Sequence, residues 1–138
     1  MRAAIERRSL DVALAYYERI GGAEARELGE PYDIAASVDR MERHREVKGS
    51  SVIIETVELT INEVTRGTEY ENVDLVVVDE IDVTRDDATG EIHTAGGRLR
   101  VWTDWSPASA ALKPQRFDYS LPSDPRVCEL DSYVRRCR

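Results

Sequence analysis

The sequence predicts a single α+β domain over residues 1–138, in which two N-terminal helices pack on a curved antiparallel sheet of about four strands and a short C-terminal helix or arm follows. Apolar residues recur every three or four positions through residues 1–48, which is the period of a helix, and every second position through residues 51–121, which is the period of a strand. Residues 122–138 form the C-terminal arm. With 138 residues, 41% of them hydrophobic, the chain can bury a core without disulfides or metals to support it.

The first helix is expected over residues 3–20, because its apolar side chains fall on one stripe. These side chains belong to Ile5, Val12, Ala13, Tyr16, Tyr17 and Ile20. Gly21-Gly22 ends the helix, since glycine adopts the left-handed conformation of a helix cap without a steric clash. Residues 23–28 are expected to add a further helical turn.

A second helix is expected to begin at Asp33, whose side chain can cap it, and to end at Gly49. Its apolar face comprises Ile34, Val38 and Met41, and its solvent face comprises Asp39, Arg40, Glu42, Arg43 and Glu46. Helices this short are not stable alone, so each is expected to lay its apolar stripe on the sheet.

The sheet is expected to begin with a strand in which Val57, Leu59 and Ile61 alternate with polar residues, and a turn at Arg66-Gly67 follows that strand. Strands over residues 72–84 and 91–105 are expected to form a hairpin, because the Asp- and Gly-containing residues between them have the chemistry of a turn.

A last strand is expected around Phe117, Tyr119 and Leu121, which again alternate with polar residues. Pro122 and Pro125 close the sheet, because proline cannot donate to a strand ladder. The sequence leaves open whether a helix or an extended arm follows.

The net charge of −8 is concentrated in the sheet region, where residues 49–105 hold thirteen acidic and four basic side chains. An acidic sheet repels phosphate backbones, so nucleic acid is disfavoured as a partner except through the arginine-rich ends. No basic stretch at the N-terminus is joined to an apolar run, and no apolar run approaches the ~20 residues of a membrane-spanning helix. We therefore expect a virion or cytoplasmic protein without a signal peptide or a membrane-spanning segment.

Arginine outnumbers lysine by 17 to 2, with Lys48 and Lys113 the two lysines. Together with the excess of carboxylates, this ratio resembles that of proteins from salt-loving archaea and their viruses, whose acidic, lysine-poor surfaces stay hydrated in concentrated salt. GC-rich coding would also favour arginine, so an actinobacterial source stays open.

The two cysteines, Cys128 and Cys137, are too few for a structural zinc site, and His44 and His93 lie far from them in sequence. Free thiols are favoured over a disulfide that closes a short C-terminal loop, on the expectation of a reducing cytosol. No glycine-rich phosphate loop, zinc-protease helix, nucleophile elbow or calcium loop is present, so no cofactor or metal is expected.

Two residues are candidates for chemistry. Asp79 interrupts the apolar face of a strand and could be a carboxylate of raised pKa in a pocket, although a strand crossover or a subunit contact accounts for it equally well. His93 could pair with a carboxylate such as Asp82 or Asp104 as a general acid and base, but an exposed strand histidine near a hairpin tip is the favoured interpretation.

The absence of a catalytic constellation, the long strands and a second tryptophan without an internal partner predict a non-enzymatic assembly subunit that forms a homo-oligomer or ring through protein contacts. With the halophile-like composition, the specific hypothesis is a virion component, such as a head–tail connector, neck or tail-completion protein, of a halophilic archaeal virus. The candidate interface residues are Trp102, Trp105, Tyr119, Arg2, Arg135 and Arg136.

The alternative is a binding or isomerase-type domain. The order of elements, helices first and then a curved antiparallel sheet, is similar to that of the NTF2-like and cystatin-like folds. Members of such folds include isomerases, dehydratases and dimerisation modules, so the resemblance implies no single activity. Under this alternative, a pocket around Asp79 and His93 binds a small molecule.

Overall fold

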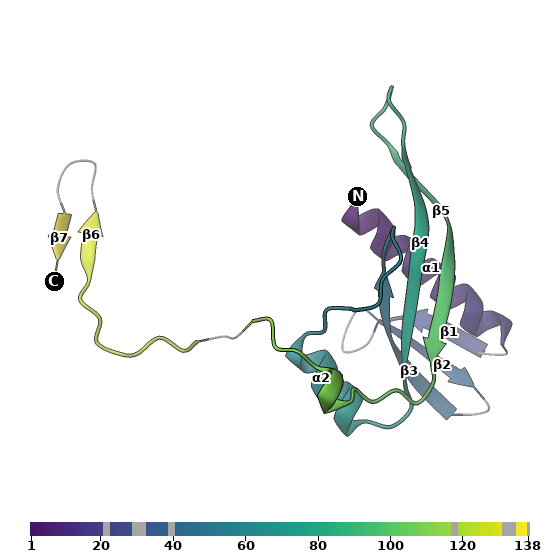
Figure 1. Cartoon of the computed structure of the whole chain (residues 1–138), viewed down its shortest axis with the longest axis horizontal. Coiled ribbons are helices and arrows are strands. Elements are labelled where there is room, and N and C mark those ends of the chain that lie inside the picture. The colour runs from purple at the N-terminus through teal and green to yellow at the C-terminus, as the bar shows by residue number, and fades with distance from the viewer. Residues whose placement is uncertain (21–22, 29–32, 39–40, 117–118, 131–134, 138) are drawn as a thin grey trace.

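A five-stranded sheet in the order β1-β2-β3-β4-β5 forms the body of the protein, and one long helix covers one of its faces (Figure 1). The computed structural model describes residues 1–20, 23–28, 33–38, 41–116, 119–130 and 135–137. The elements are α1 (Arg2–Arg19), β1 (Ala23–Glu27), β2 (Ile34–Val38), β3 (Met41–Gly49), α2 (Ile61–Glu69), β4 (Val73–Arg85), β5 (Ile92–Trp102), a 3-10 helix (Ser109–Ala111), β6 (Cys128–Leu130) and β7 (Arg135–Cys137). The predicted α+β class is confirmed, whereas the number and placement of the elements differ from the prediction.

The predicted first helix is confirmed as α1. Ser9, Ala13 and Tyr17 are buried at four-residue spacing, which is the spacing of one helical face. Ala13 and Tyr17 join Val76 and Val78 of β4 in the core. Helix α1 therefore covers the sheet face to which these even-numbered residues of β4 point.

The predicted second helix is wrong, because residues 34–38 and 41–49 form the antiparallel strands β2 and β3. The helical turn expected over residues 23–28 is also wrong, since Ala23–Glu27 is strand β1. Ile34, Ala35 and Ala36 are all buried, so the first three residues of β2 form an apolar run without the alternation of a half-exposed strand. The expected cap at Gly21-Gly22 lies outside the described residues.

The sheet is mixed rather than antiparallel, because β3 and β4 pair in parallel from His44 opposite Val73 to Gly49 opposite Val78. Parallel neighbours need a crossover connection, and residues 50–72 supply it with α2 in their middle. The expectation of an all-antiparallel sheet is therefore wrong for the pair of β3 and β4.

The strand expected around Val57, Leu59 and Ile61 is wrong, because Ile61 is the first residue of α2. Thr60 Oγ1 accepts a hydrogen bond from the Glu63 backbone N–H (3.2 Å), and Glu63 Oε2 accepts one from the Thr60 backbone N–H (2.8 Å). This reciprocal capping box fixes the start of the helix.

The turn expected at Arg66-Gly67 is also wrong, since both residues lie inside α2. Gly67 packs against Trp105 so closely that a Cβ atom at position 67 would lie 2.6 Å from the indole ring. A larger residue there would displace the helix or the ring.

The predicted hairpin is confirmed as β4 and β5, which pair from Leu75 opposite Trp102 to Arg85 opposite Ile92. Its two arms bend where Glu80 (φ 53°), Gly96 (φ 62°) and Gly97 (φ 116°) adopt left-handed backbone conformations. The hairpin tip extends beyond the rest of the sheet (Figure 1).

The C-terminal region is an extended arm rather than a helix, and it leads away from the sheet to the hairpin of β6 and β7 (Figure 1). The last strand expected in the main sheet is wrong at Tyr119 and Leu121, which lie in neither a helix nor a strand, while Phe117 lies outside the described residues. Cys128 is disulfide-bonded and Cys137, the other cysteine of the chain, is its register partner, so the expectation of free thiols is wrong. Among the helices described, none is long and apolar enough to cross a membrane.

Candidate functional site

Strand β3 directs two sets of polar side chains to opposite faces of the sheet, because successive residues of a strand alternate in direction. Arg45 points toward α1, where its guanidinium carbon lies 3.6 Å from the centre of the Tyr17 ring. Glu46 and Lys48 point toward α2, where each contacts a side chain of that helix. We call the group on the α2 side, which comprises Asp33, Glu46, Lys48, Glu63 and Arg66, the β3 site.

The first part of the β3 site joins the start of β2 to β3. Ile34 is the register partner of Arg45, so the residue before Ile34 comes beside the residue after Arg45. Asp33 is held there by two hydrogen bonds: its backbone N–H donates to the Arg45 carbonyl (3.1 Å), and its Oδ2 accepts from the Val47 backbone N–H (2.7 Å). Asp33 and Glu46 are therefore carboxylate neighbours, and Glu46 is only 2% exposed.

The second part of the site comes from α2. Lys48 Nζ lies 2.9 Å from both carboxylate oxygens of Glu63, and the two side chains are only 23% and 15% exposed. One turn further along the helix, Arg66 Nη2 donates to Glu46 Oε1 at 3.4 Å. The capping box of α2 thus places Glu63 over Lys48 and Arg66 over Glu46.

Burial and repulsion by neighbouring carboxylates make Asp33 and Glu46 harder to ionise than free carboxylates. Burial and, to a smaller extent, the negative charges of Asp33 and Glu63 together raise the pKa of Glu46 to about 7, while Arg66 opposes the increase. Burial also raises the pKa of Asp33, against the hydrogen bond from Val47 and the positive charge of Lys48. A cation placed between these carboxylates would relieve the repulsion.

Two carboxylates of this site could contribute oxygen ligands to a hard divalent cation that completes its coordination with other oxygen ligands. Within the described part of the chain, no group of three or more His, Cys, Asp or Glu side chains is arranged to hold a metal ion. Mg²⁺ does not need such a cage, because it commonly uses one or two carboxylates and takes its remaining ligands from water and substrate phosphates. Asp33 and Glu46 are the two carboxylates that could serve.

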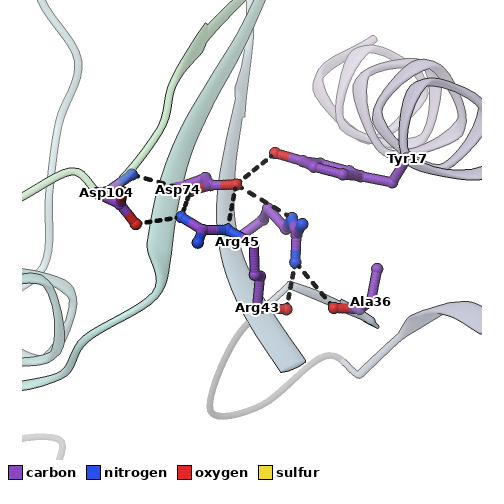
Figure 2. Close-up of polar contacts among 6 residues, drawn as sticks. All are labelled: Tyr17, Ala36, Arg43, Arg45, Asp74 and Asp104. Atoms are coloured by element: carbon purple, nitrogen blue, oxygen red, sulfur yellow. Dashed lines mark hydrogen bonds and ion pairs between the residues drawn. The ribbon is translucent and has the colours of Figure 1, made fainter. Parts of the chain in front are cut away.

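On the opposite face of β3, a buried polar network is built around Asp74 (Figure 2). Its carboxylate accepts hydrogen bonds from the Tyr17 hydroxyl (3.0 Å), Arg43 Nη2 (2.6 Å) and the Asp104 backbone N–H (3.1 Å), and Arg45 Nε lies 3.5 Å away. Arg45 is completely buried. Each charged group has an opposite charge in contact, so this network ties α1, β3 and β4 together.

Beside this network lies a cavity of about 310 Å³. The residues that line it are Tyr16, Tyr17, Ile20, Met41, Arg43, Arg45, Asp74, Val101 and Thr103. Neither Asp79 nor His93 contributes to its wall. The cavity therefore does not correspond to the pocket expected around those two residues.

Asp79 is a structural ion-pair partner in this geometry. Its carboxylate accepts hydrogen bonds from Arg98 (2.9 and 2.8 Å), Arg100 (2.8 Å) and the Ile54 backbone N–H (3.1 Å). The hydrogen bonds from Arg98 lower the pKa of Asp79 despite its burial, so the alternative of a carboxylate with a raised pKa in a pocket is wrong.

His93 is not brought near Asp79. It pairs in register with Thr84, whereas Asp79 pairs with Arg98 five positions further down the ladder. Its ring is exposed and lies 3.6 Å from Glu91, its neighbour at the hairpin tip. The structure therefore agrees with the favoured interpretation of an exposed strand histidine.

The predicted interface residues are scattered. Trp102 is 43% exposed and Tyr119 is 77% exposed, while Trp105 packs on Gly67. Arg2 is exposed and pairs with Glu6 within α1 (3.1 Å). Arg135 and Arg136 belong to β7.

The five residues of the β3 site are not among the site residues predicted from the sequence. The helix expected over residues 33–48 makes Asp33 a helix cap and Glu46 a solvent-facing helical residue, and that helix is not formed. Two local signals could have found them: an acidic residue and a lysine two positions apart, which share one face of a strand, and the capping-box spacing of Thr60 and Glu63.

Comparison with known proteins identifies a family. Residues 5–85, more than half of the chain, match the family model described as Protein NO VEIN, C-terminal. No curated protein and no solved structure matches the chain. The matched region runs from α1 to the end of β4 and contains every residue of the β3 site. This chain belongs to the NO VEIN C-terminal family.

Proposed function

We propose that this chain is a metal-dependent hydrolase of phosphodiester bonds, with nucleic acid as its substrate class. The observation that carries the proposal is the β3 site, where Asp33, Glu46 and Lys48 bring two carboxylates and an ammonium group to one point of the sheet. This function differs from the non-enzymatic subunit expected from the sequence, and also from the expectation that nucleic acid is disfavoured as a partner.

The chemistry of the side chains favours a phosphate ester over other substrates. Oxygen ligands without histidine or cysteine suit Mg²⁺ or Mn²⁺ better than zinc, and these cations bind phosphate oxygens readily. Lysine is a common point-charge partner of phosphate. Lys48 lies two residues from Glu46 on the same face of β3, so a phosphate bound to the cation can reach its ammonium group.

In the proposed reaction, Asp33 and Glu46 would hold the cation, which would supply the activation of a water molecule when bound. The water oxygen forms a new bond to phosphorus, the bond from phosphorus to one ester oxygen breaks, and the proton lost by the water passes to solvent. The departing oxygen takes up a proton, which yields one phosphomonoester and one hydroxyl group. Lys48 stabilises the negative charge that builds on the phosphoryl oxygens.

The test is cleavage of single- and double-stranded DNA and RNA by the purified chain with Mg²⁺ or Mn²⁺. We expect hydrolysis that EDTA abolishes and that Asp33→Asn, Glu46→Gln and Lys48→Met each reduce by about 100-fold or more. Lys113→Met and Glu58→Gln are the matched controls, because both residues are exposed and lie outside the site. Absence of hydrolysis on all four substrates, or equal activity of the site variants and the controls, would refute the proposal.

A second proposal is self-assembly through the C-terminal arm, which keeps the assembly predicted from the sequence but places the contact on the arm instead of on the predicted interface residues as a whole. The observation that favours it is a run of exposed apolar side chains along an extended segment, namely Leu112, Tyr119, Leu121 and Val127. The viral and halophilic assignments stay predictions.

Light scattering during size exclusion tests this second proposal, in molar KCl and in dilute buffer. We expect the full chain to form a discrete oligomer and Tyr119→Ser with Leu121→Ser to shift it toward the monomer. Lys113→Ser, on the same segment, is the control. A full chain that is monomeric in both buffers would exclude self-assembly through the arm.

A further inference from the structure

We infer that Glu63 is a positioning residue that holds the Lys48 ammonium group over the β3 site. This inference rests on the proposed function, because it assigns a role within the same site. It is carried by the two 2.9 Å contacts between Lys48 Nζ and the carboxylate of Glu63.

Glu63 itself is fixed before it meets Lys48. Its Oε2 accepts from the Thr60 backbone N–H (2.8 Å), its own backbone N–H donates to Thr60 Oγ1 (3.2 Å), and both contacts belong to the first turn of α2. The carboxylate is therefore held by a helix terminus rather than by a free rotamer. Lys48, in contrast, has a flexible four-carbon side chain that needs a partner to stay in one place.

The position of this partner matters for the other two carboxylates. Without Glu63, Lys48 would be left with Asp33, whose carboxylate already interacts with its positive charge, and with Glu46, which lies two residues away on the same face of β3. An ammonium group paired with those carboxylates would occupy the place of the cation. By pairing with Lys48 on the α2 side, Glu63 leaves the proposed metal ligands available and keeps the ammonium within reach of a phosphate.

Two substitutions separate this role from helix capping. Glu63→Gln keeps an acceptor for the Thr60 backbone N–H, because glutamine also completes a capping box, but it removes the charge that holds Lys48. Thr60→Ala removes the side-chain half of the cap and leaves the carboxylate of Glu63 in place.

The first measurement is the rate at which an acetylating reagent, sulfo-NHS-acetate, modifies each lysine of the full chain, followed by peptide mass spectrometry. The chain has only two lysines, and the exposed Lys113 is an internal reference. We expect Glu63→Gln to raise the ratio of Lys48 to Lys113 acetylation about fivefold, and Thr60→Ala to leave it near the wild-type value. An unchanged ratio in Glu63→Gln, or an equal rise in Thr60→Ala, would overturn the inference.

The second measurement is steady-state hydrolysis by the same variants. We expect Glu63→Gln to lower kcat about tenfold with little change in KM, because Lys48 acts on the transition state rather than on substrate affinity. A rise in KM at unchanged kcat would contradict a positioning role. The acetylation ratio does not depend on turnover, so the two measurements can fail separately. Absence of hydrolysis by the wild-type chain would refute the proposed function. The acetylation ratios would still show whether Glu63 holds Lys48 in place.

Discussion

Replacing Asp74 by alanine is expected to destabilise the protein by about 3–5 kcal/mol, because the substitution leaves a buried positive charge without its partner. Arg45 is completely buried, and the Asp74 carboxylate is the one acidic group described within ion-pair distance of it (3.5 Å). The same carboxylate also accepts from Tyr17 and Arg43 (Figure 2). A typical domain has only about 5–15 kcal/mol of net stability, so this single change removes a large part of it.

Urea unfolding followed by circular dichroism measures this effect for Asp74→Ala and for Asp104→Asn as a matched control. Asp104 contacts the same Arg43 side chain but is itself 69% exposed, and exposed ion pairs contribute only about 0–1 kcal/mol. Asparagine also tolerates the left-handed backbone of residue 104 (φ 53°). If both variants unfolded at the wild-type urea concentration, Arg45 would not depend on Asp74 for its charge compensation.

The parts of the fold that the sequence predicts are those whose pattern is local. Helix α1 has a full stripe of buried residues at helical spacing, and the hairpin of β4 and β5 has alternation on each side of a polar turn. For both elements, the residues that determine the structure lie close together in sequence. The predictions of their bounds agree with the structure to within a few residues.

The errors lie where long-range pairing decides the structure. The successive residues Ile34, Ala35 and Ala36 of β2 are all buried, so both faces of the strand are covered there and its apolar run lacks the period of two. Residues 57–61 alternate like a strand, yet the reciprocal hydrogen bonds of Thr60 and Glu63 begin a helix within that segment. Parallel pairing of β3 with β4 leaves no local mark in either strand.

The β3 site depends on long-range pairing in the same way. Its five residues come from the position before β2, from β3 and from α2, and they meet only because β3 pairs with β2 and α2 crosses back over the sheet. Asp79, in contrast, was noticed as a charge on an apolar face, but its two arginine partners lie on the neighbouring strand β5. A single sequence shows that a buried carboxylate is unusual and does not show whether arginine or a cation compensates it.

Glu46→Gln is expected to stabilise the protein at pH 8 by about 1–3 kcal/mol while it reduces hydrolysis by about 100-fold or more. Burial raises the pKa of Glu46 from 4.5 to about 7 in the folded protein, so the folded state binds this proton more tightly than the unfolded state does. The contribution of Glu46 to wild-type stability is therefore full below pH 4.5, declines as the pH rises from 4.5 to 7, and is lost above pH 7. Glutamine does not ionise, so the variant lacks this decline.

Thermal unfolding from pH 4.5 to 8 is the measurement, with Glu58→Gln as an exposed control that should follow the wild type. The two chains should have similar stability at pH 4.5, where Glu46 is protonated, and should diverge as the pH approaches 7. Saturating Mg²⁺ at pH 8 should raise the melting temperature of the wild type, because a ligand that binds the folded state stabilises it, and should leave Glu46→Gln unchanged. A glutamine variant less stable than the wild type at pH 8 would mean that the ion pair with Arg66 outweighs the burial of the charge. In that case Glu46 would be an ion-pair partner of α2, as Asp79 is of β5, rather than a carboxylate held ready for a cation.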